Sequence, residues 1–329
     1  VYLIRVHNQI HYSLFGTAPD TGGTVIVVGK DGYLYEQSYV KLYNTENRYP
    51  EEDLRDIARR VRRLQDEVRK MGVGFLLVIS PSKVEIYPEH LPEERLLPGR
   101  DQRTSTYDVF IPMLKEEGVE LIDAKELFVD WKKTEPYPLF ARTGTHWNYI
   151  SAGRVVGLMM DRLSGQLGRA LPSIELIDVK VDRTIYGADN DLGDLMNLWT
   201  RKRLAGDQYH PVFRRSPGDG ERKPDILIVG DSFCHTIVDV LNKNDLVANT
   251  DLFYYFKRLF DSPADEFGTP IRHAELDWRG DIFKRDAIVL QLNEYWLPKV
   301  GFGFMDGAFE VLGGPAAPTA SEGIENRPY

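Results

Sequence analysis

Apolar and polar residues follow two different periods along this chain, and the two periods alternate. Residues 50–72 carry an apolar side chain every three or four positions from Leu54 to Val68, which predicts an amphipathic helix ending at Gly72. The next apolar segment, 75–79, is continuous, as is typical of a strand buried on both faces. A helix followed by a buried strand favours an α/β fold.

The same alternation recurs over much of the chain. The other predicted helices are 107–117, 124–131, 149–163 and 233–241, and the other predicted buried strands are 119–122, 226–229 and 287–292. Residues 24–36 have a different pattern, which predicts two short strands around a turn at 30–32. We therefore expect a parallel sheet flanked by helices.

One segment in the middle of the chain breaks this pattern. Between residues 165 and 222 the periodicity weakens, and only 174–181 has the pattern of a strand. We interpret 165–222 as an insertion of mixed structure within a single α/β domain spanning 1–312. Residues 313–329 are rich in Gly, Pro and Ala, so we expect a flexible tail.

Composition narrows the choice of partners and of compartment. Lys and Arg number 41 against 50 Asp and Glu, giving a formal net charge of −9, which argues against nucleic acid as a partner. Cys234 is the single cysteine, so an internal disulfide is excluded. No apolar run reaches the roughly 20 residues of a membrane span. Because the chain begins with Val1 rather than Met, we expect that an N-terminal signal peptide or membrane anchor has been removed.

The strand at 226–229 ends in Gly-Asp-Ser, which makes Ser232 a candidate nucleophile. Ligands of open parallel sheets bind at the carboxyl ends of the strands, and a predicted helix begins beside Ser232. The N–H groups of its first turn are suited to hold an oxyanion. The alternative is that Asp231 and Ser232 only cap this helix.

A nucleophilic serine needs a base, and the chain has seven histidines. His146 lies in the stretch GTHWN, just before the predicted helix 149–163. Its alternative role is that of a half-buried structural histidine beside Trp147. His235 follows Ser232 on the same predicted helix and is a weaker candidate. The chain has no HExxH, paired-cysteine, His-x-His or phosphate-loop pattern, so we expect neither a metal nor a cofactor.

Six short motifs occur in a fixed order, and together they carry a family resemblance. They are GKDGYLY at 29–35, SPSKVEIYPEHLP at 80–92, TGTHWN at 143–148, GDL at 193–195, GDSF at 230–233 and QLNEYW at 291–296. The set resembles the alginate O-acetyltransferase-type proteins, which belong to the SGNH/GDSL hydrolase superfamily.

The resemblance implies an SGNH-like fold and O-acetyl transfer to, or removal from, a bacterial exopolysaccharide outside the cytoplasm. Ser232 matches the nucleophile of the family and His146 its base, with an acyl-serine intermediate. A membrane-bound O-acyltransferase usually supplies the acetyl group in such systems. The sequence does not separate a transferase from an acetylesterase, and a GDSL-type lipase is a third possibility.

The chain departs from the family at one position. The usual motif has an aspartate two residues before the histidine, where this chain has Gly144. Losing the acid of a triad can cost on the order of 10⁴-fold in rate. Asp194 or Glu294 could replace it, or a backbone carbonyl could hold the imidazole. The protein could instead be a catalytically weak polysaccharide-binding or scaffold protein of a secretion complex. We favour a substituted acid or a working dyad, because the serine, the histidine and the surrounding motif are intact.

Three further residues are candidates for contact with the polysaccharide. Trp147 and Tyr255 carry rings that could stack on sugars, although aromatic side chains also serve as core residues. Asn148 follows Trp147 in the same motif.

Overall fold

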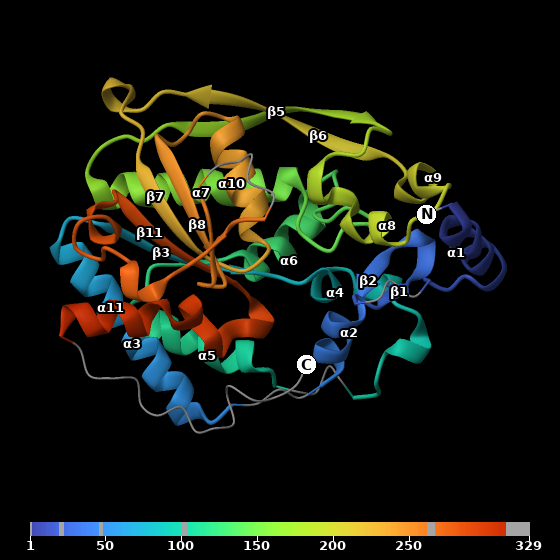
Figure 1. The fold of residues 1–329 in the computed structure, drawn as a ribbon, viewed down its shortest axis with the longest axis horizontal. Helices are drawn as coiled ribbons and strands as arrows, with labels where there is room; N and C mark the ends of the chain where they lie inside the picture. The colour runs from blue at the N-terminus through green and yellow to red at the C-terminus, as the bar shows by residue number, and fades with distance from the viewer. Residues whose placement is uncertain (1, 20–22, 46–48, 100–103, 262–266, 314–329) are drawn as a thin grey trace.

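The computed structural model describes residues 2–19, 23–45, 49–99, 104–261 and 267–313. A seven-stranded sheet in the order β10-β9-β8-β7-β11-β3-β4 forms its centre (Figure 1). Strands β8, β7, β11, β3 and β4 are parallel, and β9 and β10 are antiparallel at one edge. The strands are β3 (Gly74–Ser80), β4 (Leu121–Asp123), β7 (Asp225–Gly230), β8 (Asn249–Tyr254), β9 (Arg258–Phe260), β10 (Thr269–Pro270) and β11 (Ala287–Asn293). The expected parallel sheet is confirmed.

Helices cover both faces of this sheet (Figure 1). One face carries α3 (Glu51–Lys70), α5 (Thr106–Glu116) and α11 (Phe304–Leu312), and the other carries α6 (Ala124–Thr134), α7 (Tyr149–Leu167) and α10 (Cys234–Lys243). Strand β3 shows why its sequence is apolar throughout. Phe75 and Leu77 join the core on the α3 face, whereas Leu76 and Val78 join the core on the α7 face.

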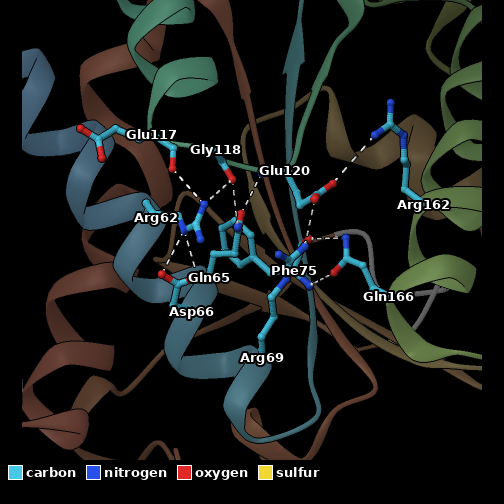
Figure 2. A network of polar contacts seen from close by, with 10 residues as sticks. All are labelled: Arg62, Gln65, Asp66, Arg69, Phe75, Glu117, Gly118, Glu120, Arg162 and Gln166. Carbon is cyan, nitrogen blue, oxygen red and sulfur yellow. Dashed lines mark hydrogen bonds and ion pairs between the residues drawn. The ribbon is translucent and has the colours of Figure 1, made fainter.

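A network of polar contacts fastens the helices around the beginning of β3 (Figure 2). The buried amide of Gln65, on α3, donates to the carbonyl of Gly118 at 3.2 Å and accepts from the N–H of Glu120 at 2.7 Å. The amide of Gln166, on α7, bonds both the N–H and the carbonyl of Phe75. Two side-chain amides, each bonded through both its nitrogen and its oxygen, thus link α3 and α7 to the amino ends of β4 and β3.

The predicted insertion, 165–222, contains an antiparallel ribbon of β5 (Ser173–Asp182) and β6 (Gln208–Ser216). Two short helices, α8 (Asp191–Leu195) and α9 (Arg201–Ala205), lie between these strands. Phe213 of β6 packs over Gly153 of α7, where a Cβ would stand 2.1 Å from its ring. The single-domain boundaries stay a prediction, and residues 314–329 of the predicted tail lie outside the described residues.

The amino-terminal part of the chain contains a separate two-stranded sheet. Strands β1 (Ile26–Val28) and β2 (Leu34–Glu36) form the predicted antiparallel pair. Helices α1 (Tyr2–Phe15), α2 (Gln37–Asn44) and α4 (Lys83–Ile86) lie near this pair (Figure 1). Among the described residues, no helix combines the length and the apolar character that crossing a membrane requires.

Candidate active site

Ser232 follows β7 at the carboxyl edge of the sheet, and a tight turn presents it there. A Cβ on Gly230 would stand 2.4 Å from the sulfur of Cys234 and 2.6 Å from the carbonyl oxygen of Gln291, so only glycine fits. The carboxylate of Asp231 accepts from the N–H of Phe233 at 3.0 Å and from the N–H of Asn293 at 2.5 Å. These bonds tie the serine turn to the end of the neighbouring strand β11.

His146 approaches Ser232 from the loop that precedes α7. Its Nε2 lies 2.8 Å from the Oγ of Ser232. The indole N–H of Trp147, the next residue, donates to the carbonyl of Phe233 at 3.2 Å. The ring of Phe233 packs edge-on against the imidazole. The GTHWN and GDSF motifs are therefore in direct contact, although 86 positions separate His146 from Ser232.

The other nitrogen of the imidazole meets Asp191, the first residue of α8. Its Oδ2 lies 2.6 Å from the Nδ1 of His146. Its Oδ1 accepts from the N–H of Thr145 at 2.8 Å and from that of Leu192 at 2.6 Å. Both oxygens are held by hydrogen bonds, so the carboxylate fixes the orientation of the ring and the tautomer that leaves Nε2 facing Ser232.

Neither acid that the sequence suggested as the partner of His146 occupies this position. Asp194 accepts from Asn190 at 2.9 Å and from Arg201 at 2.6 Å. Glu294 accepts from the N–H of Ser82 at 2.9 Å and lies 2.5 Å from the Nζ of Lys125. That expectation was wrong because each carboxylate is bonded to other groups.

Gly144, where the family resemblance led us to expect an aspartate, is packed against the segment that carries Asp191. A Cβ on Gly144 would stand 3.0 Å from the carbonyl oxygens of both Ala188 and Asp189. Such contacts are too tight unless the backbone of 188–189 shifts. The glycine therefore lets the insertion approach residues 141–148, the histidine loop, which carries His146 and precedes α7. The carboxylate beside the imidazole is that of Asp191, which belongs to the insertion. A backbone carbonyl is not needed to hold the imidazole.

The electrostatic surroundings of His146 favour its charged form. Burial by itself lowers the pKa of His146 and is the largest single influence on it. The hydrogen bond and the negative charge of Asp191, together with the charges of Asp231 and Glu36, outweigh burial, so the net result is a raised pKa. The imidazole that lies beside Ser232 therefore binds a proton more readily than an ordinary histidine does.

Lys83, from the SPSK motif, holds the histidine loop from the opposite side. Its Nζ lies within 2.7 to 3.0 Å of four backbone carbonyl oxygens, those of Leu34, Ala141, Arg142 and Gly144. Burial lowers the pKa of Lys83 to about 7. The sequence comparison marked this lysine only as part of a motif. Lys83 can bind all four carbonyl groups only because the fold brings β2, α4 and the histidine loop together.

The three predicted substrate-binding residues have different environments. Trp147 is fully buried, so its ring belongs to the core, and the prediction that it contacts substrate was wrong. Asn148 is buried and caps α7, accepting from the N–H of Ser151 at 3.0 Å. Tyr255 is half-buried, its side chain lies near that of Ser232, and its φ is 50°, a strained value for a residue with a side chain. Contact of Asn148 or Tyr255 with a ligand stays a prediction.

Two donors, one on Ser232 and one on Asn293 at the end of β11, are left without acceptors among the described residues. The side-chain Nδ2 of Asn293 is buried and has no partner among the described residues, although its Oδ1 accepts from the N–H of Tyr295 at 3.2 Å. Such groups are uncommon in native structures and need an explanation. The backbone N–H of Ser232 likewise makes no hydrogen bond within the described residues. Within the same residues, no cluster of three or more His, Cys, Asp or Glu side chains could hold a metal.

The chain is similar to several known proteins. The sequence model "SGNH hydrolase-like domain, acetyltransferase AlgX" matches residues 26–242, about two thirds of the chain. A protein of Pseudomonas aeruginosa described as "Probable alginate O-acetylase AlgJ" is 28% identical over 193 residues. That match includes 57% of this chain but only 44% of the relative, so the chain spans less than half of the relative's length.

Two solved structures share the fold. The O-acetyltransferase domain of Pseudomonas putida AlgJ superimposes with a TM-score of 0.52 at 17% identity, covering 83% of this chain and 92% of that one. Pseudomonas aeruginosa AlgX gives a TM-score of 0.51 at 15% identity, covering 88% of this chain and 68% of that one.

Proposed function

The chain belongs to the SGNH hydrolase-like acetyltransferase family of AlgX, and from this membership we propose that it is a serine-dependent O-acetyltransferase or acetylesterase of a bacterial exopolysaccharide. We place the reaction outside the cytoplasm. The observation that carries the proposal is the continuous chain of contacts from Asp191 through His146 to Ser232. The match to a protein described as an alginate O-acetylase supports a polysaccharide as substrate.

The first half-reaction follows from these contacts. The Oγ of Ser232 attacks the carbonyl carbon of an acetyl ester while its proton passes to the Nε2 of His146. Asp191 stabilises the imidazolium that forms and holds its Nδ1–H. When the tetrahedral intermediate collapses, the ester bond breaks, the imidazolium returns the proton to the leaving oxygen, and acetyl-Ser232 remains.

The second half-reaction decides between the two activities. A hydroxyl of the acceptor, or water, gives its proton to the Nε2 of His146 as it attacks the carbonyl carbon of acetyl-Ser232. When the second tetrahedral intermediate collapses, the bond from the acyl carbon to the Oγ of Ser232 breaks, and the imidazolium returns the proton to that oxygen. A sugar hydroxyl yields the acetylated polysaccharide, and water yields acetate. As in the systems that the motifs resemble, we propose that a membrane-bound O-acyltransferase supplies the acetyl group for transfer.

The negative charge of each tetrahedral intermediate needs donors. We assign this role to the backbone N–H of Ser232 and to the Nδ2 of Asn293, since both lack acceptors and the backbone of Asn293 is bonded to Asp231 of the serine turn. A donor that is held in place before the reaction needs little reorganisation when the charge develops.

The alternative of a catalytically weak polysaccharide-binding or scaffold protein has less support than the sequence suggested. Gly144 was the feature in its favour. Because Asp191 occupies the place beside the Nδ1 of His146, the missing aspartate at position 144 no longer argues against catalysis.

Hydrolysis of a chromogenic acetyl ester by wild type and by Ser232→Ala tests the proposal. We expect the variant to lose at least about 10³-fold in kcat, since removal of the nucleophile leaves only the binding and oxyanion contributions. Intact-mass analysis of wild type should detect one added acetyl group, and the variant should lack it. Equal rates in the two proteins would rule out the serine mechanism.

A further inference from the structure

A polar cavity lies between the histidine loop and the insertion, apart from the catalytic residues. Its volume is about 240 Å³, and its walls come from three parts of the chain: the hairpin at Tyr33, the loop segment 138–142 with Asn148, and the insertion at Asp189 and 205–209. Neither His146 nor Ser232 lines it. The chemistry proposed above therefore leaves this cavity without a role.

Asp189 is the most unusual group in its wall. The residue is only 3% exposed, yet its Oδ1 is buried and has no hydrogen-bond partner among the described residues. Burial and the neighbouring charge of Asp191 raise the pKa of Asp189 well above its ordinary value. A buried carboxyl group without a partner is costly in free energy, so its retention calls for a donor that is not part of the protein.

Gln208 repeats this situation on the same wall. Its Nε2 donates to the carbonyl of Ala205 at 3.1 Å, which fixes the amide, while its Oε1 is buried and unpartnered. Two buried oxygens in one cavity thus lack donors. The side chain of Arg142, also in the wall, is exposed and makes no hydrogen bond or ion pair within the described residues.

These groups have complementary demands. Two buried acceptors suit a ligand with several hydroxyl groups, an unpaired guanidinium suits an anionic substituent, and the rings of Tyr33 and Tyr209 offer flat apolar surface. A lone cation would satisfy the carboxylate but not the guanidinium. A phosphate or sulfate would satisfy the guanidinium but would be repelled by the carboxylate.

From this we infer that the cavity is a subsite for one anionic sugar unit of the acceptor polysaccharide, with its hydroxyls on Asp189 and Gln208 and its charge on Arg142. The inference rests on the proposed function. The same two segments of the chain carry the cavity residues and the catalytic residues. Asp189 lies two residues before Asp191, and Arg142 lies four residues before His146. A sugar unit bound there would anchor the chain that presents its hydroxyl to acetyl-Ser232.

The test is calorimetric titration of alginate oligosaccharides into the Ser232→Ala protein, which binds without turnover. Adding Asp189→Asn should weaken binding roughly 10-fold, the usual loss for one hydrogen bond. Arg142→Gln should weaken alginate binding to a similar extent and leave the weaker binding of a neutral cello-oligosaccharide nearly unchanged. Glu175→Gln, an exposed acid on β5 paired with Arg214, is the matched control and should bind as the parent does.

Thermal unfolding separates a ligand-binding role of Asp189 from a structural one. Because Asp189→Asn removes a buried acid without removing a hydrogen bond, we expect its Tm to equal or exceed that of the parent. A Tm several degrees lower would mean that Asp189 supports the fold, and would overturn the inference.

The binding outcomes also separate this inference from the proposed function. Unchanged affinity in both Asp189→Asn and Arg142→Gln, or no binding of either glycan by the parent, overturns the subsite. The acetyl-ester assay with Ser232→Ala decides the proposed function independently, since a small ester does not need the cavity.

Discussion

Gln65 and Asn293 are buried amides at opposite ends of the central sheet, and they differ in how completely they are bonded. At the amino ends of the strands, the Gln65 amide uses both its nitrogen and its oxygen on backbone groups of the α5–β4 connection (Figure 2). At the carboxyl end of β11, Asn293 uses only its oxygen, and its buried Nδ2 has no partner among the described residues.

A second pair of amides shows the same difference. Gln166 bonds both the N–H and the carbonyl of Phe75, whereas Gln208 donates to Ala205 and leaves its Oε1 unpartnered in the cavity. Amides that hold elements together are satisfied by the protein. Asn293 and Gln208 each keep one hydrogen-bonding group open, as is expected where a reacting or bound molecule completes the set, whereas Asn148 beside them uses both its nitrogen and its oxygen within the protein.

The largest change expected at the carboxyl end comes from Asp191→Asn. The amide can turn its NH₂ toward Nδ1 and so favour the wrong tautomer, and the imidazolium loses its counter-charge. We expect kcat for acetyl-ester hydrolysis to fall on the order of 10³- to 10⁴-fold. Steady-state kinetics with the chromogenic ester measures this loss.

Asp194→Asn is the matched control for that experiment. Asp194 lies on the same short helix, but it bonds Asn190 and Arg201 rather than His146. It should retain nearly the rate of wild type. Comparable losses in the two variants would show that α8 is merely sensitive to substitution, and that Asp191 is not the partner of His146 in solution.

The next largest effect is expected from Asn293→Ala. If the open Nδ2 stabilises the oxyanion, its removal should lower kcat on the order of 10²-fold. The loss of stability should be small, because no bond from Nδ2 to the protein is broken, although the N–H of Tyr295 loses its acceptor. An unchanged kcat together with a large loss of stability would place Asn293 with the structural amides.

Gln65→Ala should give the reverse result. Its removal leaves the buried carbonyl of Gly118 and the N–H of Glu120 without this partner, at a cost of about 2 kcal/mol in the free energy of unfolding. Denaturant titration measures this cost. Because the network lies away from Ser232, kcat should remain within about twofold of wild type, and a loss of activity comparable to that of Asn293→Ala would remove the distinction between the two ends.

The regular part of the fold could be predicted from the sequence because burial imposes it. The helix α3 and the strands β3, β7 and β11 have apolar patterns that match their environments. Strand β8 was missed because its sequence, NTDLFY, begins with polar residues. Strand β6 was missed because most of its side chains are half-buried, so they do not alternate between buried and exposed.

The candidate site shows the same limit. Ser232 and His146 could be found because each lies in a motif next to a predicted element. Asp191 could not, because a contact across 45 positions depends on how the insertion packs over Gly144. The GDL motif drew attention to Asp194, three residues too far along α8. The absence of a side chain at position 144 was the available signal, since it shows that something else must occupy that space.

The smallest effect expected is a shift of the pH dependence, and it tests the electrostatics of the site separately from its geometry. His146 must be neutral to accept the proton of Ser232, so kcat/KM should rise with pH through the pKa of His146. Asp191 is the main group that raises this pKa against the effect of burial. Asp191→Asn should therefore move the rising limb to lower pH, even as the rate itself falls. Asp231 and Glu36 remain and limit the shift.

The limb of Asp194→Asn should coincide with that of wild type. A limb that stays in place or moves to higher pH in Asp191→Asn would show that the Asp191 charge does not act on the histidine that titrates.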